Sequence, residues 1–209
     1  MIKTEIFKID PDDPDVKIID RCARIIVKGG LVAFPTETVY GLGASALDED
    51  AVDRIYKVKN RPRTKPLAIQ VADIKTIEKM GCRLTPAATA LANVFWPGPL
   101  TMVLEDASGR KMGFRMPAHK VALGLLKKTG LPIAVPSANL SGEPPAKNAR
   151  DVRKSFDGKI EAILDGGEAY IGVESTVVDL AGDEPKILRE GAISRERILE
   201  ACGRHHGKD

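Results

Sequence analysis

Apolar positions along this chain recur with two different spacings, and each spacing predicts a different kind of element. Between residues 16 and 27 they lie three or four positions apart, which predicts a helix that begins at Asp13-Pro14 and ends at Gly29-Gly30. Residues 31–34 are apolar without interruption, which predicts a buried strand. That strand should end at Pro35, because proline cannot donate a hydrogen bond to a sheet.

The rest of the chain repeats this exchange of strands and helices. Further strands are expected at 4–9, 67–71, 100–105, 113–116, 132–136, 162–164, 175–180 and 186–188. Further helices are expected at 48–58, 73–80, 85–95 and 118–128, and from Asn148 and Ser194 onward. The alternation predicts one α/β domain over residues 1–202, followed by a flexible tail at 203–209. Because turns join the late strands, the sheet should be mixed, with parallel and antiparallel pairs flanked by helices (α+β in some schemes).

The composition is that of an ordinary globular protein: of 209 residues, 43% are hydrophobic and 29% are charged. No apolar run is long enough to cross a membrane, and the N-terminus lacks the apolar core of a signal peptide. We therefore expect a cytoplasmic protein with no membrane partner. The net charge of +3 is too small to indicate a nucleic-acid partner by itself.

Cysteine and histidine residues are few and scattered. Cys22, Cys82 and Cys202 fit neither a disulfide framework nor a paired-cysteine metal motif. Two of the three histidines lie in the polar C-terminal tail. These residues argue against a zinc site and against a histidine-based triad, and we expect no metal held by the protein.

The segment after the predicted strand at 31–34 is rich in hydroxyl groups. Thr36, Glu37, Thr38 and Tyr40 follow Pro35, and open α/β sheets bind ligands at the carboxyl ends of strands. The alternative is a connecting loop whose threonines bond their own backbone. Residues 41–46 loosely match a dinucleotide fingerprint, but the match lies past the strand end and basic residues follow where an acidic ribose ligand belongs.

A run of cations follows the second predicted helix, at Lys57, Lys59, Arg61, Arg63 and Lys65. A solvated helix end would explain the first two, since cations are favoured there. The other three lie in a loop stiffened by prolines, and a rigid basic loop suits a polyanion such as a triphosphate. Small polar loops also follow the later strands, and no nucleophile–base pair accompanies them.

Seven motifs, in matching order, resemble the YrdC-like family: FPTETVYGLG (34–43), KNRPRTKPL (59–67), FWPGPLT (95–101), RMPAH (115–119), PSANLSG (136–142), GVESTVVD (172–179) and ILREG (187–191). The resemblance implies the YrdC-like fold, a twisted mixed α/β sheet with a large basic concavity. It covers nearly the whole chain and is closest in kind to the short, single-domain members.

The best-known members of that family are threonylcarbamoyl-AMP synthases. The resemblance implies synthesis of threonylcarbamoyl-AMP from L-threonine, bicarbonate and ATP, with release of pyrophosphate and with Mg²⁺ accompanying the nucleotide. The product would serve threonylcarbamoyladenosine modification of tRNA, with hand-over to the threonylcarbamoyl transferase complex. The substrates supply nucleophile and leaving group in this reaction, so cations and hydroxyls suffice for positioning and charge neutralisation.

Carried over position by position, the resemblance assigns Lys59 and Arg61 to a catalytic pair. It assigns ATP contacts to Arg61, Lys65, Asn139, Lys147 and Arg189. It assigns threonine contacts to Thr38, Gln70, Arg115, Ser137 and Ser175. Two positions depart from the family pattern: Gln70 stands where many members have His, and Lys147 where many have Ser or Thr.

Two other functions stay open on the sequence alone. One is an RNA-binding module whose basic concavity grips the phosphate backbone of tRNA or double-stranded RNA, which would give a steep loss of affinity with salt. The other is a related carbamoyl-transfer enzyme with a different acceptor, and the family also contains paralogues of uncertain activity.

Overall fold

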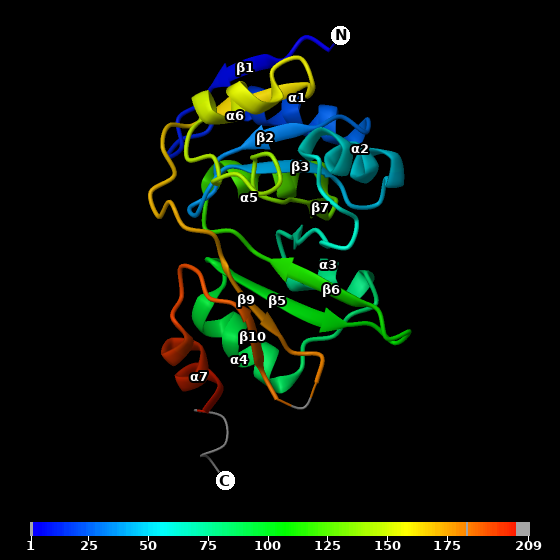
Figure 1. Ribbon diagram of the computed structural model, residues 1–209, viewed down its shortest axis with the longest axis vertical. Coiled ribbons are helices and arrows are strands. Elements are labelled where there is room, and N and C mark those ends of the chain that lie inside the picture. The colour runs from blue at the N-terminus through cyan, green and yellow to red at the C-terminus, as the bar shows by residue number, and fades with distance from the viewer. Residues whose placement is uncertain (1, 183, 204–209) are drawn as a thin grey trace.

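A computed structural model describes residues 2–182 and 184–203, and in it ten strands form one continuous sheet (Figure 1). The strands lie in the order β1-β8-β2-β3-β7-β4-β6-β5-β9-β10. Their bounds are β1 Glu5–Lys8, β2 Val32–Phe34, β3 Gly41–Ser45, β4 Ile69–Gln70, β5 Leu100–Glu105, β6 Lys111–Arg115, β7 Ile133–Ala134, β8 Ala162–Asp165, β9 Thr176–Asp179 and β10 Lys186–Arg189. Parallel pairs such as β5–β9 and antiparallel pairs such as β5–β6 both occur, so the predicted mixed sheet is confirmed.

The helices begin and end largely where the sequence places caps. Their bounds are α1 Val16–Val27, α2 Glu49–Lys59, α3 Ile74–Lys79, α4 Pro86–Phe95, α5 Lys120–Thr129, α6 Ala149–Phe156 and α7 Arg195–Gly203. The Asp48 carboxylate accepts a hydrogen bond from the amide of Ala51 at 3.0 Å, and Gly130 ends α5 in the left-handed conformation. Helix α1 begins later than predicted, because Asp15 rather than Asp13 is its N-cap.

The upper half of the sheet, strands β1, β8, β2 and β3, carries helices on both faces (Figure 1). Successive side chains of a strand point to opposite faces. Val32 and Phe34 pack in a core with α1 and α5, whereas Leu31 and Ala33 pack in a second core with α2 and α6. The unbroken apolar run at 31–34 therefore reflects a strand that is buried on both sides.

The lower half, strands β4, β6, β5, β9 and β10, is covered on one face only. Leu100, Met102 and Leu104 of β5 pack against the core formed with α3, α4 and α7. The alternate residues Thr101 and Val103 point to the opposite face, which lines a cleft. The uncovered face of this half is therefore the floor of the candidate site.

Strand β7 joins the two halves and is only two residues long. Ile133 and Ala134 pair with Ser45 and Ala44 of β3 on one side, and with the two residues of β4 on the other. The sheet thus narrows at its middle, beside the cleft.

One strand was not predicted. Residues 41–45 lie outside the strands expected from the sequence, but they form β3, which pairs antiparallel with β2. A Cβ at Gly41 would lie 2.4 Å from Val135 Cγ1, and one at Gly43 would lie 2.7 Å from Phe34 Cε1. These glycines are required by side-chain packing, and only Gly41 also lines the cleft. Of the expected tail at 203–209, Gly203 ends α7 and residues 204–209 lie outside the described residues.

Candidate functional site

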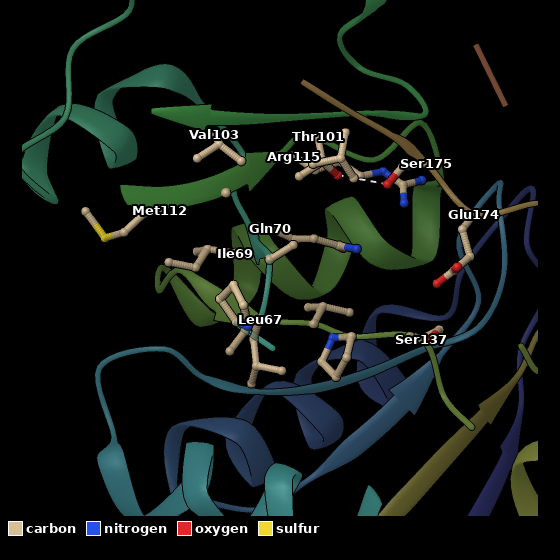
Figure 2. Close-up of a pocket in the computed structure, with 18 of the residues that line it drawn as sticks. Leu67, Ile69, Gln70, Thr101, Val103, Met112, Arg115, Ser137, Glu174 and Ser175 are labelled. Atoms are coloured by element: carbon tan, nitrogen blue, oxygen red, sulfur yellow. Dashed lines mark hydrogen bonds between the residues drawn. The ribbon is translucent and has the colours of Figure 1, made fainter. Parts of the chain in front are cut away.

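A cleft of about 750 Å³ lies between the uncovered face of the lower half and the loops of the upper half (Figure 2). Most of the predicted site residues line it: Thr38, Arg61, Gln70, Arg115, Ser137, Ser175 and Arg189. Figure 2 shows Arg115, Thr101 and Ser175 gathered at one end, while Val103 and Met112 lie toward the other. We call the end with Arg115, Thr101 and Ser175 the polar end.

The loop at the end of β2 supplies Thr36 and Thr38. Thr36 Oγ1 donates to the carbonyl of Val39 at 2.7 Å and lies 2.9 Å from Thr38 Oγ1. The Thr36 hydroxyl therefore bonds the backbone of its own loop, as the connecting-loop alternative expected, and both Thr36 and Thr38 line the cleft.

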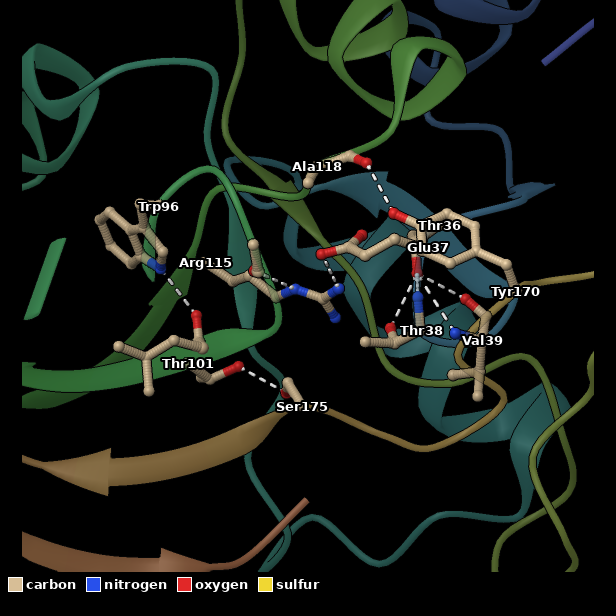
Figure 3. Close-up of polar contacts among 12 residues, drawn as sticks. Thr36, Glu37, Thr38, Val39, Trp96, Thr101, Arg115, Ala118, Tyr170 and Ser175 are labelled. Carbon is tan, nitrogen blue, oxygen red and sulfur yellow. Dashed lines mark hydrogen bonds and ion pairs between the residues drawn. The ribbon is translucent and has the colours of Figure 1, made fainter. Parts of the chain in front are cut away.

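Arg115, at the end of β6, forms a buried ion pair with Glu37 (Figure 3). Arg115 Nη2 lies 2.8 Å from Glu37 Oε1, and only 6% of Arg115 and 1% of Glu37 is exposed. The contact lacks hydrogen-bond geometry, so Nη2 and both carboxylate oxygens have no hydrogen-bond partner. Arg115 Nε donates to the carbonyl of Gly98 at 3.2 Å. Gln70 lies beside Arg115 in parallel register, and its buried Oε1 also has no partner.

Thr101 and Ser175 form a hydroxyl pair next to Arg115. Their Oγ atoms lie 2.8 Å apart, and both residues line the cleft. Arg189 Nη2 donates to the Ser175 carbonyl at 2.9 Å, and Arg189 Nη1 pairs with the Glu174 carboxylate at 2.9 Å. Sequence reasoning missed Thr101, although its polar side chain between Leu100 and Met102 in an apolar strand was a signal.

Lys59 lies behind the cleft wall rather than on it. Its Nζ donates to the carbonyl of Ser137 at 2.5 Å and to the carbonyl of Asn139. Burial, aided by the nearby Arg61 charge, lowers the pKa of Lys59 to about 8. The ammonium group therefore ties the end of α2 to the loop that follows β7.

Arg61 lines the cleft, but its guanidinium folds back on its own loop. Nε donates to the carbonyl of Lys65 and Nη2 to the carbonyl of Pro66, each at 2.9 Å. Burial lowers the pKa of Arg61 from its usual value. These bonds tie the Arg61 side chain to its own loop, whereas Lys65 itself does not line the cleft.

Two other predicted ATP ligands lie outside the cleft wall. The Asn139 side-chain amide donates to the carbonyls of Leu140 and Glu143 at 2.9 and 2.7 Å, which leaves its buried Oδ1 without a partner. The Lys147 ammonium packs against Gly172, where a Cβ would lie 3.1 Å from Nζ. The structure therefore does not bring Lys147 to the cleft defined by Arg115 and Ser175.

Two cations that line the cleft beside Met112 were not predicted. Arg110 and Lys111 line it and form ion pairs with Asp106 at 3.1 Å and Asp179 at 2.9 Å. Within residues 2–182 and 184–203, no group of three or more His, Cys, Asp or Glu side chains could hold a metal ion. None of the helices in that same part of the chain is long and apolar enough to span a membrane.

Fold and site together define an α/β protein with an open, cationic, hydroxyl-lined cleft. The model of the Sua5/YciO/YrdC family, described as "Telomere recombination", matches residues 24–191. This chain belongs to that family.

Known relatives and structures extend over most of the chain. It is 48% identical to the threonylcarbamoyl-AMP synthase of Pyrococcus abyssi over 190 residues, which is 87% of this chain and 56% of that protein. It is 42% identical to the synthase of Bacillus subtilis, over 95% of this chain and 60% of that one. The crystal structure of P. abyssi Sua5 complexed with L-threonine superposes with a TM-score of 0.91 at 43% identity, over 99% of this chain and 65% of that chain. The chain thus spans little more than half the length of these relatives.

Proposed function

We propose that this chain synthesises threonylcarbamoyl-AMP from L-threonine, bicarbonate and ATP, releasing pyrophosphate. The observation that carries the proposal is that Arg115 and the hydroxyl residues Thr38, Ser137 and Ser175 line one cleft, in a chain similar to proteins named for this reaction. A hydroxyl and a carboxylate are the groups that such a set of side chains recognises.

The substrates supply the reacting groups. The threonine amine adds to carbon dioxide with loss of a proton, or to bicarbonate with loss of water, to form a carbamate. A carbamate oxygen then attacks the α-phosphorus of ATP. Pyrophosphate then leaves with its bond electrons. The protein contributes orientation and neutralisation of phosphate charge, and a cationic cleft without a nucleophile–base pair suits that task.

In this proposal Arg115 holds the threonine carboxylate, while Thr38, Gln70, Ser137 and Ser175 contact the rest of the amino acid. The triphosphate is bound by Arg61 and Arg189 from the cleft wall, with Lys65, Asn139 and Lys147 as further contacts from the neighbouring loops. Lys59 supports the Ser137–Asn139 loop. Glu174 and Asp179, two acidic residues that line the cleft, are already paired with cations, so Mg²⁺ would be held mainly by phosphate oxygens and water.

The proposal extends to the biological context. The product would feed threonylcarbamoyladenosine modification of tRNA in the cytoplasm, through hand-over to the threonylcarbamoyl transferase complex. Direct binding of tRNA is a separate proposal. Its support is the positive charge of the cleft, which would attract the phosphate backbone.

One assay tests the proposal. Pyrophosphate release is measured from ATP and bicarbonate with each standard amino acid in turn, and the adenylate is identified by mass spectrometry. Threonine should stimulate release far more than the other amino acids, and release should require bicarbonate. Release that does not depend on any amino acid would reject the synthase, and strongly salt-dependent binding of RNA would then favour the RNA-binding module.

A further inference from the structure

Glu37 is a buried carboxylate that none of the site assignments uses. It lies in the loop between β2 and β3, is 1% exposed, and does not itself line the cleft. Neither of its carboxylate oxygens accepts a hydrogen bond, although Oε1 lies 2.8 Å from Arg115 Nη2. Buried polar atoms are nearly always hydrogen-bonded, so an acid left in this state requires an explanation.

The backbone around Glu37 is held firmly on both sides. The amide of Ile171 donates to the Glu37 carbonyl at 3.0 Å, and the amide of Gly172 donates to the Thr38 carbonyl at 2.8 Å. Thr36 closes the loop from the other side through its bond to Val39. The position of the carboxylate is therefore set by the surrounding loops rather than by hydrogen bonds of its own.

Arg115 is held along two edges of its guanidinium group. Nε donates to the Gly98 carbonyl, and Nη2 faces Glu37 (Figure 3). Within residues 2–182 and 184–203, the hydrogen bond and the ion pair of Arg115 involve Nε and Nη2 and leave Nη1 unused, and Arg115 lines the cleft. The guanidinium therefore presents one free nitrogen to the cleft while Glu37 and Gly98 restrain the others.

Stability alone explains this pair poorly. A buried ion pair without hydrogen bonds to complete it stabilises a fold weakly, because the cost of removing both charges from water offsets their attraction. A buried arginine that has to meet an anionic ligand needs a counter-charge before the ligand arrives and a fixed orientation when it does.

We propose that Glu37 is a positioning residue that aims the Arg115 guanidinium at the carboxylate of a small acid bound in the polar end of the cleft. The identity of that acid as threonine rests on the proposed function. Bound acid and Glu37 then bracket the guanidinium from opposite sides. Glu37 acts through Arg115 and touches no substrate.

The test compares Glu37→Gln, Arg115→Gln and the double variant by steady-state pyrophosphate release. Glu37→Gln should raise KM for threonine about tenfold or more, because a charge-assisted contact loses its geometry, while KM for ATP stays within about twofold. The double variant should be no worse than Arg115→Gln alone, because both changes remove the same contact. Glu5→Gln is the matched control. Glu5 lies on β1, and its carboxylate forms an ion pair with Arg21 at 2.6 Å, so this change also removes one carboxylate from an ion pair with arginine. It should leave both KM values unchanged.

An unchanged KM for threonine in Glu37→Gln, or losses that multiply in the double variant, would overturn the proposal. Glu37→Asp keeps the charge and should restore part of the threonine affinity, which a purely structural defect would not show. If Glu37→Gln does not fold, Glu37→Asp carries the same comparison against Arg115→Gln.

A spectroscopic readout separates this inference from the proposed function. The Arg115 Nε–H signal in a ¹⁵N-labelled sample should be protected from solvent exchange in the wild type, lose protection in Glu37→Gln and keep part of it in Glu37→Asp. Equal protection in wild type and variants would reject the positioning role. A wild-type enzyme that releases no pyrophosphate would reject the synthase, whereas the exchange comparison would still decide whether Glu37 orients Arg115.

Discussion

Lys59 Nζ lies 2.5 Å from the carbonyl oxygen of Ser137, and this contact ties the end of α2 to the loop after β7. The same ammonium group also donates to the Asn139 carbonyl. A lysine that the sequence places among phosphate ligands thus holds together the loop that carries other site residues. Its substitution should affect both the fold and the reaction.

Lys59→Ala should therefore lower pyrophosphate release at least tenfold and lower the free energy of unfolding by about 1–3 kcal/mol, because two partly buried carbonyls lose their donor. The protein should remain folded. Lys57→Ala is the control, since Lys57 is an exposed cation on the same helix. Turnover and urea denaturation measure the two effects, and near-full turnover at limiting ATP would contradict the assignment.

Arg61→Ala should raise KM for ATP by tenfold or more, because a charge-assisted contact contributes about 1.5–3 kcal/mol. The matched control is Arg63→Ala in the same basic loop, since Arg63 pairs with Asp53 and does not line the cleft. Initial rates at varied ATP and saturating threonine check both variants. Equal effects of the two substitutions would show that the loop acts only through its net charge.

Thr101→Val should raise KM for threonine about 2–13-fold, the range expected when a neutral hydrogen bond of about 0.5–1.5 kcal/mol is lost. Valine keeps the shape of the side chain, so the Ser175 hydroxyl loses its partner without a cavity. The exposed Thr89→Val on α4 serves as the control. A Thr101→Val enzyme with wild-type kinetics would place Ser175 outside the amino-acid contacts.

The free energy of unfolding should decrease as the pH is lowered below about 6.5, because of His119. Its Nδ1 accepts a hydrogen bond from the Val121 amide at the start of α5, and burial lowers its pKa, opposed by the charges of Glu37 and Asp12. Because the folded pKa lies below the unfolded value, the unfolded chain binds more protons between the two. This contribution to stability is therefore complete above about pH 6.5 and is lost as the pH falls below it.

His119→Asn removes the titrating group and keeps a good helix N-cap. Urea denaturation at pH 5.5 and 7.5 should show a smaller difference for this variant than for the wild type. The same pH difference in both proteins would assign the acid sensitivity to other groups.

The rate constant kcat/KM should fall from threonine to serine and further to valine. Serine keeps the hydroxyl and lacks one methyl group, a loss of about 1–3 kcal/mol. Valine keeps the shape but leaves polar groups such as Thr38 and Ser175 facing a methyl group, which usually costs more. Pyrophosphate release with the three amino acids below saturation gives the order. If kcat/KM for valine equals that for threonine, the pocket selects its substrate by shape alone.

Much of the fold follows from local sequence, because its signals act over a few residues. The caps at Asp48 and Asn148 and the strand at 31–34 are of this kind. The strand character of residues 41–45 was missed, because glycines favour loops by themselves and only the packing of Phe34 and Val135 reveals why they are there.

The site is predictable as a set of residues but not as a set of roles. Arg115 and Ser175 do line one cleft. The pairing of Glu37 with Arg115 joins positions 78 residues apart (115 − 37), and no local pattern contains it. Likewise, the sequence does not distinguish a lysine that binds phosphate from one whose ammonium group donates to backbone carbonyls, as Lys59 does.

The two-residue strand β7 has a consequence for how the molecule opens. Hydrophobic contacts are divided among separate cores, one in the lower half and two in the upper half, and few backbone hydrogen bonds cross between the halves at β7. Local unfolding follows such boundaries, since contiguous units open together. Amide hydrogens of β5 and β9 should therefore exchange with solvent as one cooperative unit, and those of β2 and β8 as another. Any ligand that bridges the cleft would couple the two units and slow the exchange of both.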